Sequence, residues 1–121
     1  MPKSRTLTEA ERKRLEKERE QTKVELERLR EYMRAQPEPV DDEVTLDVYE
    51  REKNLALVRR LETKLRSIED ALRSAKKGRY GICERCGQPI DRERLKALPE
   101  TTVCVKCKNE MEKAARRAAL G

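Results

Sequence analysis

Four cysteines arranged in two C-x-x-C pairs constrain this chain more than any other feature. They are Cys83, Cys86, Cys104 and Cys107, and 17 residues separate the two pairs. Two residues between cysteines allow a tight turn to direct both sulfurs at one metal ion, about 2.3 Å away. The spacing between the pairs is typical of a four-thiolate zinc site. The sequence therefore predicts one structural zinc ion held by all four cysteines.

Two disulfides or a redox-active pair are the alternatives for these cysteines. The N-terminal sequence MPKSRTLTEAER has no apolar leader, so we expect a cytoplasmic protein, in a compartment where thiols stay reduced. No thioredoxin-like β-α-β pattern accompanies either pair. Because four protein ligands leave no position for water on the metal, we expect no catalytic zinc and no enzyme activity.

The composition favours an elongated, mostly α-helical protein with a small zinc lobe. Of the 121 residues, 45% are charged, and the only aromatic residues are three tyrosines, which is too little for one globular core of ordinary size. The net charge of +6 is compatible with an acidic partner or with nucleic acid. No apolar run approaches the ~18 residues that a membrane span requires, so we expect no membrane contact.

Two long helices are predicted before the cysteines. A capping box formed by Thr8 and Glu11 opens the first, which runs without Gly or Pro to about Gln36. Two prolines then disfavour helix, and the second helix is expected from near Asp41 or Asp42 until Gly78 ends it. Apolar or neutral positions alternate at intervals of four and three residues from Thr22 to Met33 and from Val58 to Ala75. The full set is Leu15, Thr22, Leu26, Leu29 and Met33, followed by Val44, Val48, Leu55, Val58, Leu61, Leu65, Ile68, Leu72 and Ala75.

These seams predict an antiparallel coiled-coil hairpin over residues 7–77, with its tip near 36–47. There are two alternatives to this hairpin. One is a single charged helix with disordered parts, and the other is a dimer that pairs its seams between chains. We expect a monomer. Residues 1–6 are expected to form a flexible tail.

The zinc lobe is predicted over 78–108 and a C-terminal helix over 109–121. The small core around the metal is expected to consist of Ile90, Leu95, Leu98 and Val103. The C-terminal helix carries a stripe that we expect to pack on the base of the hairpin, formed by Met111, Ala114, Ala115 and Ala118.

The predicted tip is acidic, whereas the remainder of the chain is basic. No Lys or Arg occurs between Arg34 and Arg51, and this stretch holds Glu38, Asp41, Asp42, Glu43, Asp47 and Glu50. The preference of acidic residues for a helix N-terminus would account for Asp41 to Glu43, but not for a run of sixteen residues without Lys or Arg. An acidic tip at the end of a rod can meet a basic surface or a bound Mg²⁺, which binds carboxylate oxygens.

The sequence resembles the DksA/TraR family of bacterial transcription regulators. The resemblance is strongest in the run G-x-Y-G-x-C-x-x-C-G that begins at Gly78, and continues through Ile90, an R-L-x-A segment from Arg94, Pro99 and the final C-x-x-C-K. It implies a protein that binds RNA polymerase rather than a specific DNA sequence. The hairpin would enter the secondary channel of the polymerase, with Asp41, Asp42, Glu43 and Asp47 as the tip effectors near the catalytic Mg²⁺.

Two departures from the family pattern affect these implications. The best-known members carry D-x-x-D-x-A at the tip, and no register of VDDEVTLDVYE supplies it. Guanosine tetraphosphate is a candidate ligand through Arg94 and Lys108, which match basic positions of the family. However, Ser67 and Leu98 stand where the best-known member has basic side chains.

Two other functions are compatible with the residues. A zinc module that binds DNA would contact phosphates through Lys108, Lys113, Arg116 and Arg117, although the acidic stretch would repel DNA. A scaffold that dimerises through the coiled-coil seams is the other.

Overall fold

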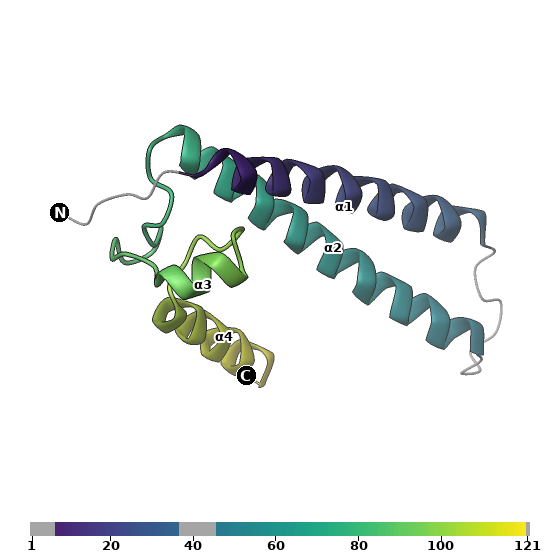
Figure 1. Ribbon diagram of the computed structural model, residues 1–121. Coiled ribbons are helices and arrows are strands. Elements are labelled where there is room, and N and C mark those ends of the chain that lie inside the picture. Colours follow the sequence, from purple (N-terminus) through teal and green to yellow (C-terminus); the bar gives the residue numbers. More distant parts are fainter. Residues whose placement is uncertain (1–6, 37–45, 121) are drawn as a thin grey trace.

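The computed structural model describes residues 7–36 and 46–120. This part of the chain contains the helices α1 (Glu9–Ala35), α2 (Leu46–Lys76), α3 (Arg92–Ala97) and α4 (Val105–Leu120). α1 and α2 lie side by side and antiparallel, and the lobe with α3 and α4 lies at the end where α1 begins and α2 ends (Figure 1). The helical hairpin expected from the two seams is therefore confirmed.

α1 begins at the predicted capping box. The side chain of Thr8 accepts a hydrogen bond from the backbone of Glu11, and the Glu11 carboxylate accepts one from the backbone of Thr8, each at 3.1 Å. The helix ends one residue before Gln36, whose backbone is extended, as expected for a residue that precedes proline. The predicted second-helix start at Asp41 or Asp42 lies outside the described residues.

α2 ends in a Schellman motif built on Gly78. The N–H of Gly78 donates to the carbonyl of Ala75 at 3.1 Å, and the N–H of Arg79 donates to the carbonyl of Ser74 at 2.8 Å. Gly78 has a φ of +70°, which only glycine adopts without strain. This cap turns the chain out of the hairpin and into the lobe.

The two seams meet as their periodicity predicts. Leu15, Thr22 and Leu26 of α1 are buried, and so are Leu61 and Ile68 of α2. An ion pair of 3.2 Å between Arg30 and Glu62 joins the helices beside the seam. The buried apolar contacts fix the register of the hairpin, and the partly exposed ion pair adds little to them.

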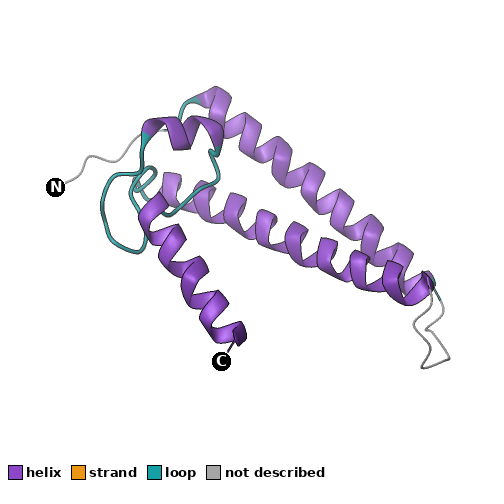
Figure 2. Ribbon diagram, turned by 90° about the horizontal axis from the view of Figure 1, so that it is seen from below, coloured by secondary structure: helices purple, strands orange, loops and turns teal. Residues whose placement is uncertain are grey.

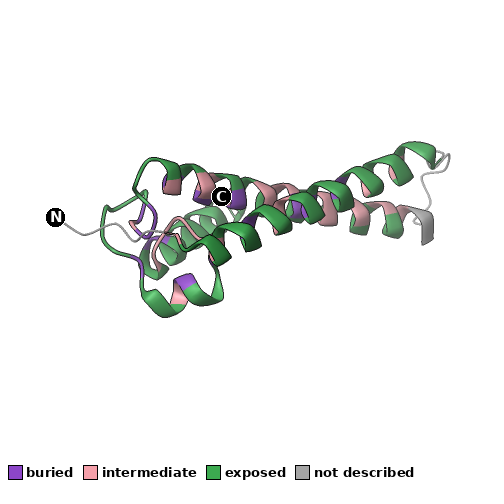
Figure 3. Ribbon diagram, turned by 45° about the horizontal axis from the view of Figure 1, so that its top comes forward, coloured by how far each residue is buried: buried purple, intermediate pink, exposed green. Residues whose placement is uncertain are grey.

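One core cluster joins the base of the hairpin to the zinc lobe. Its members are Leu15, Ile68, Ala71, Tyr80, Cys83, Ile90, Leu95 and Cys107. Figure 3 shows that the buried positions are concentrated in the lobe and in the adjoining part of the hairpin. The lobe is therefore packed on the hairpin rather than tethered to it.

Two packing predictions were wrong. The stripe of α4 formed by Met111, Ala114, Ala115 and Ala118 is exposed, and α4 lies apart from α1 and α2 (Figures 1 and 2). Leu98 is 43% exposed, whereas its neighbour Pro99 is fully buried. Ile90 and Leu95 are buried and Val103 packs against the cluster, as predicted.

None of the helices in the described part of the chain is both long and apolar enough to cross a membrane.

Candidate metal centre and its surroundings

The first knuckle, residues 83–87, is a tight turn closed by backbone hydrogen bonds. The N–H of Gly87 donates to the carbonyl of Cys83 at 2.9 Å, and Gly87 has a φ of +76°. The N–H of Cys86 points at the sulfur of Cys83, 3.5 Å away. An isolated antiparallel bridge between Ile82 and Pro89 holds the two ends of the turn together.

The second knuckle, residues 104–107, repeats this geometry at the start of α4. The N–H of Cys107 lies 3.5 Å from the sulfur of Cys104, and the N–H of Lys108 donates to the carbonyl of Cys104 at 2.9 Å. The N–H of Glu84 donates to the carbonyl of Thr102 at 2.9 Å. This last bond joins the first knuckle to the segment that leads into the second.

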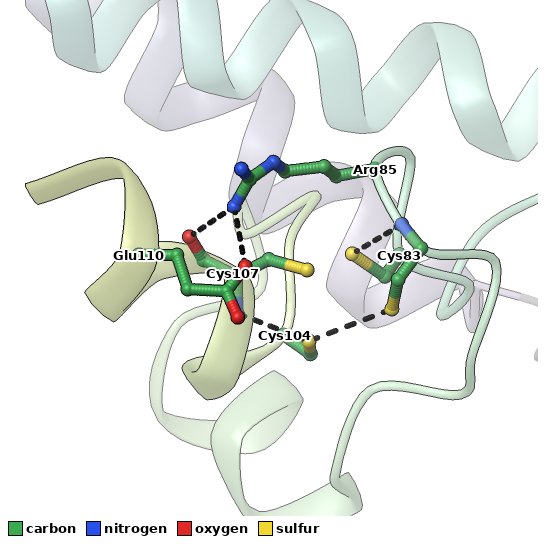
Figure 4. A network of polar contacts seen from close by, with 6 residues as sticks. Cys83, Arg85, Cys104, Cys107 and Glu110 are labelled. Atoms are coloured by element: carbon green, nitrogen blue, oxygen red, sulfur yellow. Dashed lines mark hydrogen bonds and ion pairs between the residues drawn. The ribbon is translucent and has the colours of Figure 1, made fainter. Parts of the chain in front are cut away.

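The two knuckles bring the four cysteine sulfurs within 4.8 Å of one another. The sulfurs of Cys86 and Cys104 are 3.8 Å apart (Figure 4), far beyond the ~2.05 Å of a disulfide bond. Four thiolates in a tetrahedron about 2.3 Å from one zinc ion lie about 3.8 Å from each other. The cluster therefore has the dimensions of a four-thiolate zinc site.

The two buried cysteines differ in their acidity. Burial disfavours the charged form of Cys83, but backbone hydrogen bonds from Cys104, Cys86 and Arg85 outweigh it and lower the pKa of this thiol from 9.0 to about 6. Burial and the neighbouring cysteine sulfurs raise the pKa of Cys107 to about 12. Without metal, negative charge therefore accumulates first on Cys83.

Arg85 connects the first knuckle to the second and to α4. Its guanidinium donates to the carbonyl of Cys107 at 3.2 Å and forms an ion pair of 2.9 Å with Glu110 (Figure 4). The bond to Cys107 was missed, because it depends on how the knuckles face each other.

Two further hydrogen bonds secure the lobe, and sequence reasoning missed both. The hydroxyl of Ser74, which is buried near the end of α2, donates to the Glu84 carboxylate at 3.0 Å. The hydroxyl of Tyr80 donates to the carbonyl of Pro99 at 3.0 Å. The single aromatic residue between the glycines of GRYG was the available signal for the second bond.

Of the other predicted site residues, those that the structure describes are not members of the four-cysteine cluster. Asp41, Asp42 and Glu43 fall outside the described residues, and Asp47 lies in the first turn of α2. Arg94 lies on α3, where its Nε donates to the carbonyl of Val103 at 3.4 Å. Lys108 is exposed on α4.

The lobe matches a known zinc finger. The sequence profile of the prokaryotic dksA/traR C4-type zinc finger matches residues 78–113, which include all four cysteines. The family and the close cysteines together support zinc binding by this chain.

Two curated relatives match part of the chain. An uncharacterized protein of Aquifex aeolicus is 53% identical over 49 residues, which cover 40% of this chain and 34% of that protein. The RNA polymerase-binding transcription factor DksA of Escherichia coli is 32% identical over 81 residues, which cover 63% of this chain and 49% of that protein. The chain thus spans between a third and a half of the length of these relatives.

A solved structure extends the similarity to the hairpin. The structure of transcription factor DksA2 from Pseudomonas aeruginosa is 30% identical, with a TM-score of 0.62, and the match covers 91% of this chain and 89% of that one. The match therefore extends over both the long hairpin and the lobe. This chain belongs to the DksA/TraR family.

Proposed function

We propose that the chain is a transcription regulator that binds RNA polymerase and catalyses no reaction of its own. The observation that carries the proposal is the match of the hairpin and lobe together to transcription factor DksA2. The name of the Escherichia coli relative states polymerase binding for that protein. Because the lobe shares its core with the base of the hairpin, the base can bind a partner while the other end of the hairpin extends away from it.

The hairpin is proposed to enter the secondary channel of the polymerase with its tip first. α1 alone has 27 residues, which corresponds to about 40 Å of helix. The acidic residues Asp41, Asp42, Glu43 and Asp47 are the proposed effectors near the catalytic Mg²⁺, because carboxylate oxygens are its preferred protein ligands. Charge complementarity with a basic channel would mainly set the rate and register of entry.

One zinc ion, held by Cys83, Cys86, Cys104 and Cys107, is the proposed cofactor. Zinc would fix the two knuckles, and hence the direction in which α4 leaves the lobe. Four thiolate ligands leave no coordination position for water, so the proposed role of the metal is structural.

Guanosine tetraphosphate is the candidate small-molecule ligand, and positive charge beside Ser67 supports testing it. Ser67 lines a hollow of about 350 Å³ together with Arg59, Arg60 and Lys64. The side chains of Arg59, Arg60 and Lys64 place positive charge around Ser67, which has no charge of its own. Equilibrium dialysis with the polymerase complex, using Arg94→Ala and Lys108→Ala, tests whether the two matched basic residues take part.

Competition for the polymerase is the decisive experiment. Purified chain should bind RNA polymerase core, and a second protein known to occupy the secondary channel should displace it. Asp42→Ala with Asp47→Ala should retain an affinity for polymerase within about threefold but alter transcription. Long-range charge affects the rate of association more than the affinity of the complex. The matched control, Glu20→Ala with Glu25→Ala, removes the same charge from exposed positions of α1 and should change neither. If the tip variant lost polymerase binding and the control did not, the assignment of binding to the base and of regulation to the tip would be contradicted.

DNA binding is the second candidate, and the exposure of α4 is the observation that favours it. Lys108, Lys113, Arg116 and Arg117 are all exposed on this helix. Gel shifts over a salt series distinguish the two functions, since tight binding with a steep salt dependence is the signature of phosphate contacts. We expect no sequence-specific shift and a monomer in sedimentation.

A further inference from the structure

One layer of the coiled-coil seam is polar. Along α1 the seam positions from Leu15 to Leu26 follow each other at intervals of four, three and four residues, and the two between them hold Arg19 and Thr22. Thr22 is buried and Arg19 is half-buried, so both side chains lie within the interface. Seam positions of a coiled coil normally hold apolar side chains, because they face the partner helix. We name Arg19 and Thr22 the polar layer.

The polar layer contains a buried donor that lacks a hydrogen-bond partner. The Nε of Arg19 is buried, and none of the described residues accepts a hydrogen bond from it. Burying a donor without an acceptor is unfavourable, and replacing a buried charged group by a well-packed apolar one often stabilises a protein. The hairpin is therefore less stable at the polar layer than a continuous apolar seam would make it.

The packing of α2 is also looser at this level. The two helices are antiparallel, so the polar layer lies between the core cluster and the ion pair of Arg30 with Glu62. Leu65 is the seam position of α2 at this level. It is half-buried, whereas the seam positions before and after it are buried, and a hollow of about 270 Å³ opens beside it. The loose packing and the unpartnered donor therefore lie at the same level of the hairpin.

The two sides of the polar layer differ in how deeply they are buried. Toward the lobe, the seam joins the core cluster that the hairpin shares with the lobe. Toward the other end, Leu26 and Leu61 are the buried members of the seam among the residues that the structure describes. The other described seam positions on that side are half-buried, and they are Leu29, Met33, Val48, Leu55 and Val58. Segments with few buried apolar contacts open more readily than the rest of a fold.

We infer that the polar layer divides the hairpin into two blocks that open separately. The base block comprises residues 9–18 and 66–76 and closes together with the lobe. The outer block comprises residues 23–35 and 46–64. Apolar contact along a seam couples each turn to the next, and a polar layer interrupts that coupling. The outer block can therefore open or reorient while the base block stays closed, whether or not the chain binds RNA polymerase.

Amide hydrogen exchange of the zinc-loaded chain, followed by NMR, tests the division. Protection factors should form two plateaus, with those of the outer block at least about tenfold lower than those of the base block. The step between the plateaus should fall at residues 19–22 of α1 and near Leu65 of α2. A gradual decrease along each helix would instead indicate fraying from the helix ends, and would contradict a boundary at the polar layer.

A substitution in one block shows whether the other responds. Leu26→Ala removes a buried side chain from the outer block, so protection there should fall by at least about tenfold. Protection in the base block should change by less than about twofold, as expected for independent sites. Leu29→Ala, at a half-buried position, gives the same comparison with a smaller effect in case Leu26→Ala melts the outer block. Arg28→Ala is the control, because Arg28 is exposed on the same helix and should alter neither block.

Filling the polar layer should join the two blocks. Arg19→Leu with Thr22→Leu removes the unpartnered donor and continues the apolar seam, so protection of the outer block should rise by about tenfold or more. With the layer filled, Leu26→Ala should lower protection on both sides of it. Gln21→Leu with Arg28→Leu, the matched control at exposed positions of α1, should leave the two blocks separate.

Three further outcomes would overturn the division. If Leu26→Ala lowered the protection of both blocks equally while the polar layer was intact, the hairpin would be one cooperative unit. If the blocks stayed separate after the layer was filled, Arg19 and Thr22 would not be what divides them. Protection that rose with protein concentration would assign the effect to pairing of two copies, so exchange is measured at two concentrations. None of these measurements uses polymerase, so their failure would leave the proposed function intact.

Discussion

Arg85 and Glu110 join the first knuckle to α4 by an ion pair of 2.9 Å beside the cysteine cluster. Both side chains are about half exposed, so the pair itself contributes little, about 0–1 kcal/mol. The same guanidinium also holds the carbonyl of Cys107 and places positive charge near four sulfurs. Arg85 therefore has two roles near the proposed zinc site, and Glu110 serves only to orient it.

This difference predicts unequal effects on zinc affinity. Arg85→Ala should lower the affinity by about tenfold or more, the range observed when residues that support metal ligands are removed. Glu110→Gln should lower it by less than about threefold, because an exposed ion pair is weak. Competition with a chromophoric chelator measures both affinities. Similar losses in the two variants would show that Arg85 acts only through its ion pair.

The pKa values of the two buried cysteines predict how zinc affinity depends on pH. Zinc binds thiolates and displaces any proton that a thiol still carries. Cys107, with its pKa raised to about 12, carries its proton throughout the neutral range. Cys83, with its pKa lowered to about 6, carries one only below that pH.

The slope of log affinity against pH should therefore increase by one proton below pH about 6, and affinity should fall more steeply there than at neutral pH. Chelator competition between about pH 5 and 8 measures the slope, with the chelator's own protonation subtracted. A constant slope across this range would contradict the lowered pKa of Cys83.

The buried hydroxyl of Tyr80 should contribute measurably to stability. Tyr80→Phe leaves the Pro99 carbonyl without its donor, at a cost of about 1 kcal/mol in the free energy of unfolding. Urea unfolding of the zinc-loaded protein measures the change. Tyr49→Phe provides the control, because Tyr49 is 65% exposed on α2 and its hydroxyl is accessible to water in both states.

Gly78→Ala should destabilise the junction between hairpin and lobe. No atom lies within 4 Å of the added methyl group, so the cost comes from the backbone conformation at φ +70°, about 1–2 kcal/mol for a residue with a Cβ atom. Thermal unfolding followed by circular dichroism measures it. Gly78→Asn should cost less, since asparagine tolerates this conformation better. If the two variants were equally stable, the Schellman motif would not account for the glycine.

The features that could be predicted from the sequence are those encoded locally. The Thr8–Glu11 cap, the seam through Leu15 and Leu26, and the glycine at the end of α2 each depend on residues a few positions apart. The C-x-x-C spacing likewise predicted two knuckles that bring their sulfurs together. In each case the periodicity or the turn chemistry alone determines the local geometry.

The predictions that were wrong, and the contacts that were missed, depend on how these elements are placed relative to one another. The Met111 stripe of α4 has the right spacing for packing, but the second knuckle sends the helix away from the hairpin. The chain leaves α3 with a non-helical backbone at Leu98, and the next residue, Pro99, is the buried one, with its carbonyl bonded to the Tyr80 hydroxyl. Arg85 contacts Cys107 only because two turns distant in sequence face each other.

The cluster that joins Leu15 to Cys107 has a consequence for how the protein is made. Its members range from Leu15 to Cys107, so the base cannot close until the ribosome has released the chain as far as Cys107. The hairpin can form earlier, because its two helices are closer in sequence than the members of this cluster. Contacts between residues far apart in sequence form later. Nascent chains that stop short of Cys107 would therefore carry a helical hairpin with an open base, which is a species for chaperones and proteases to recognise.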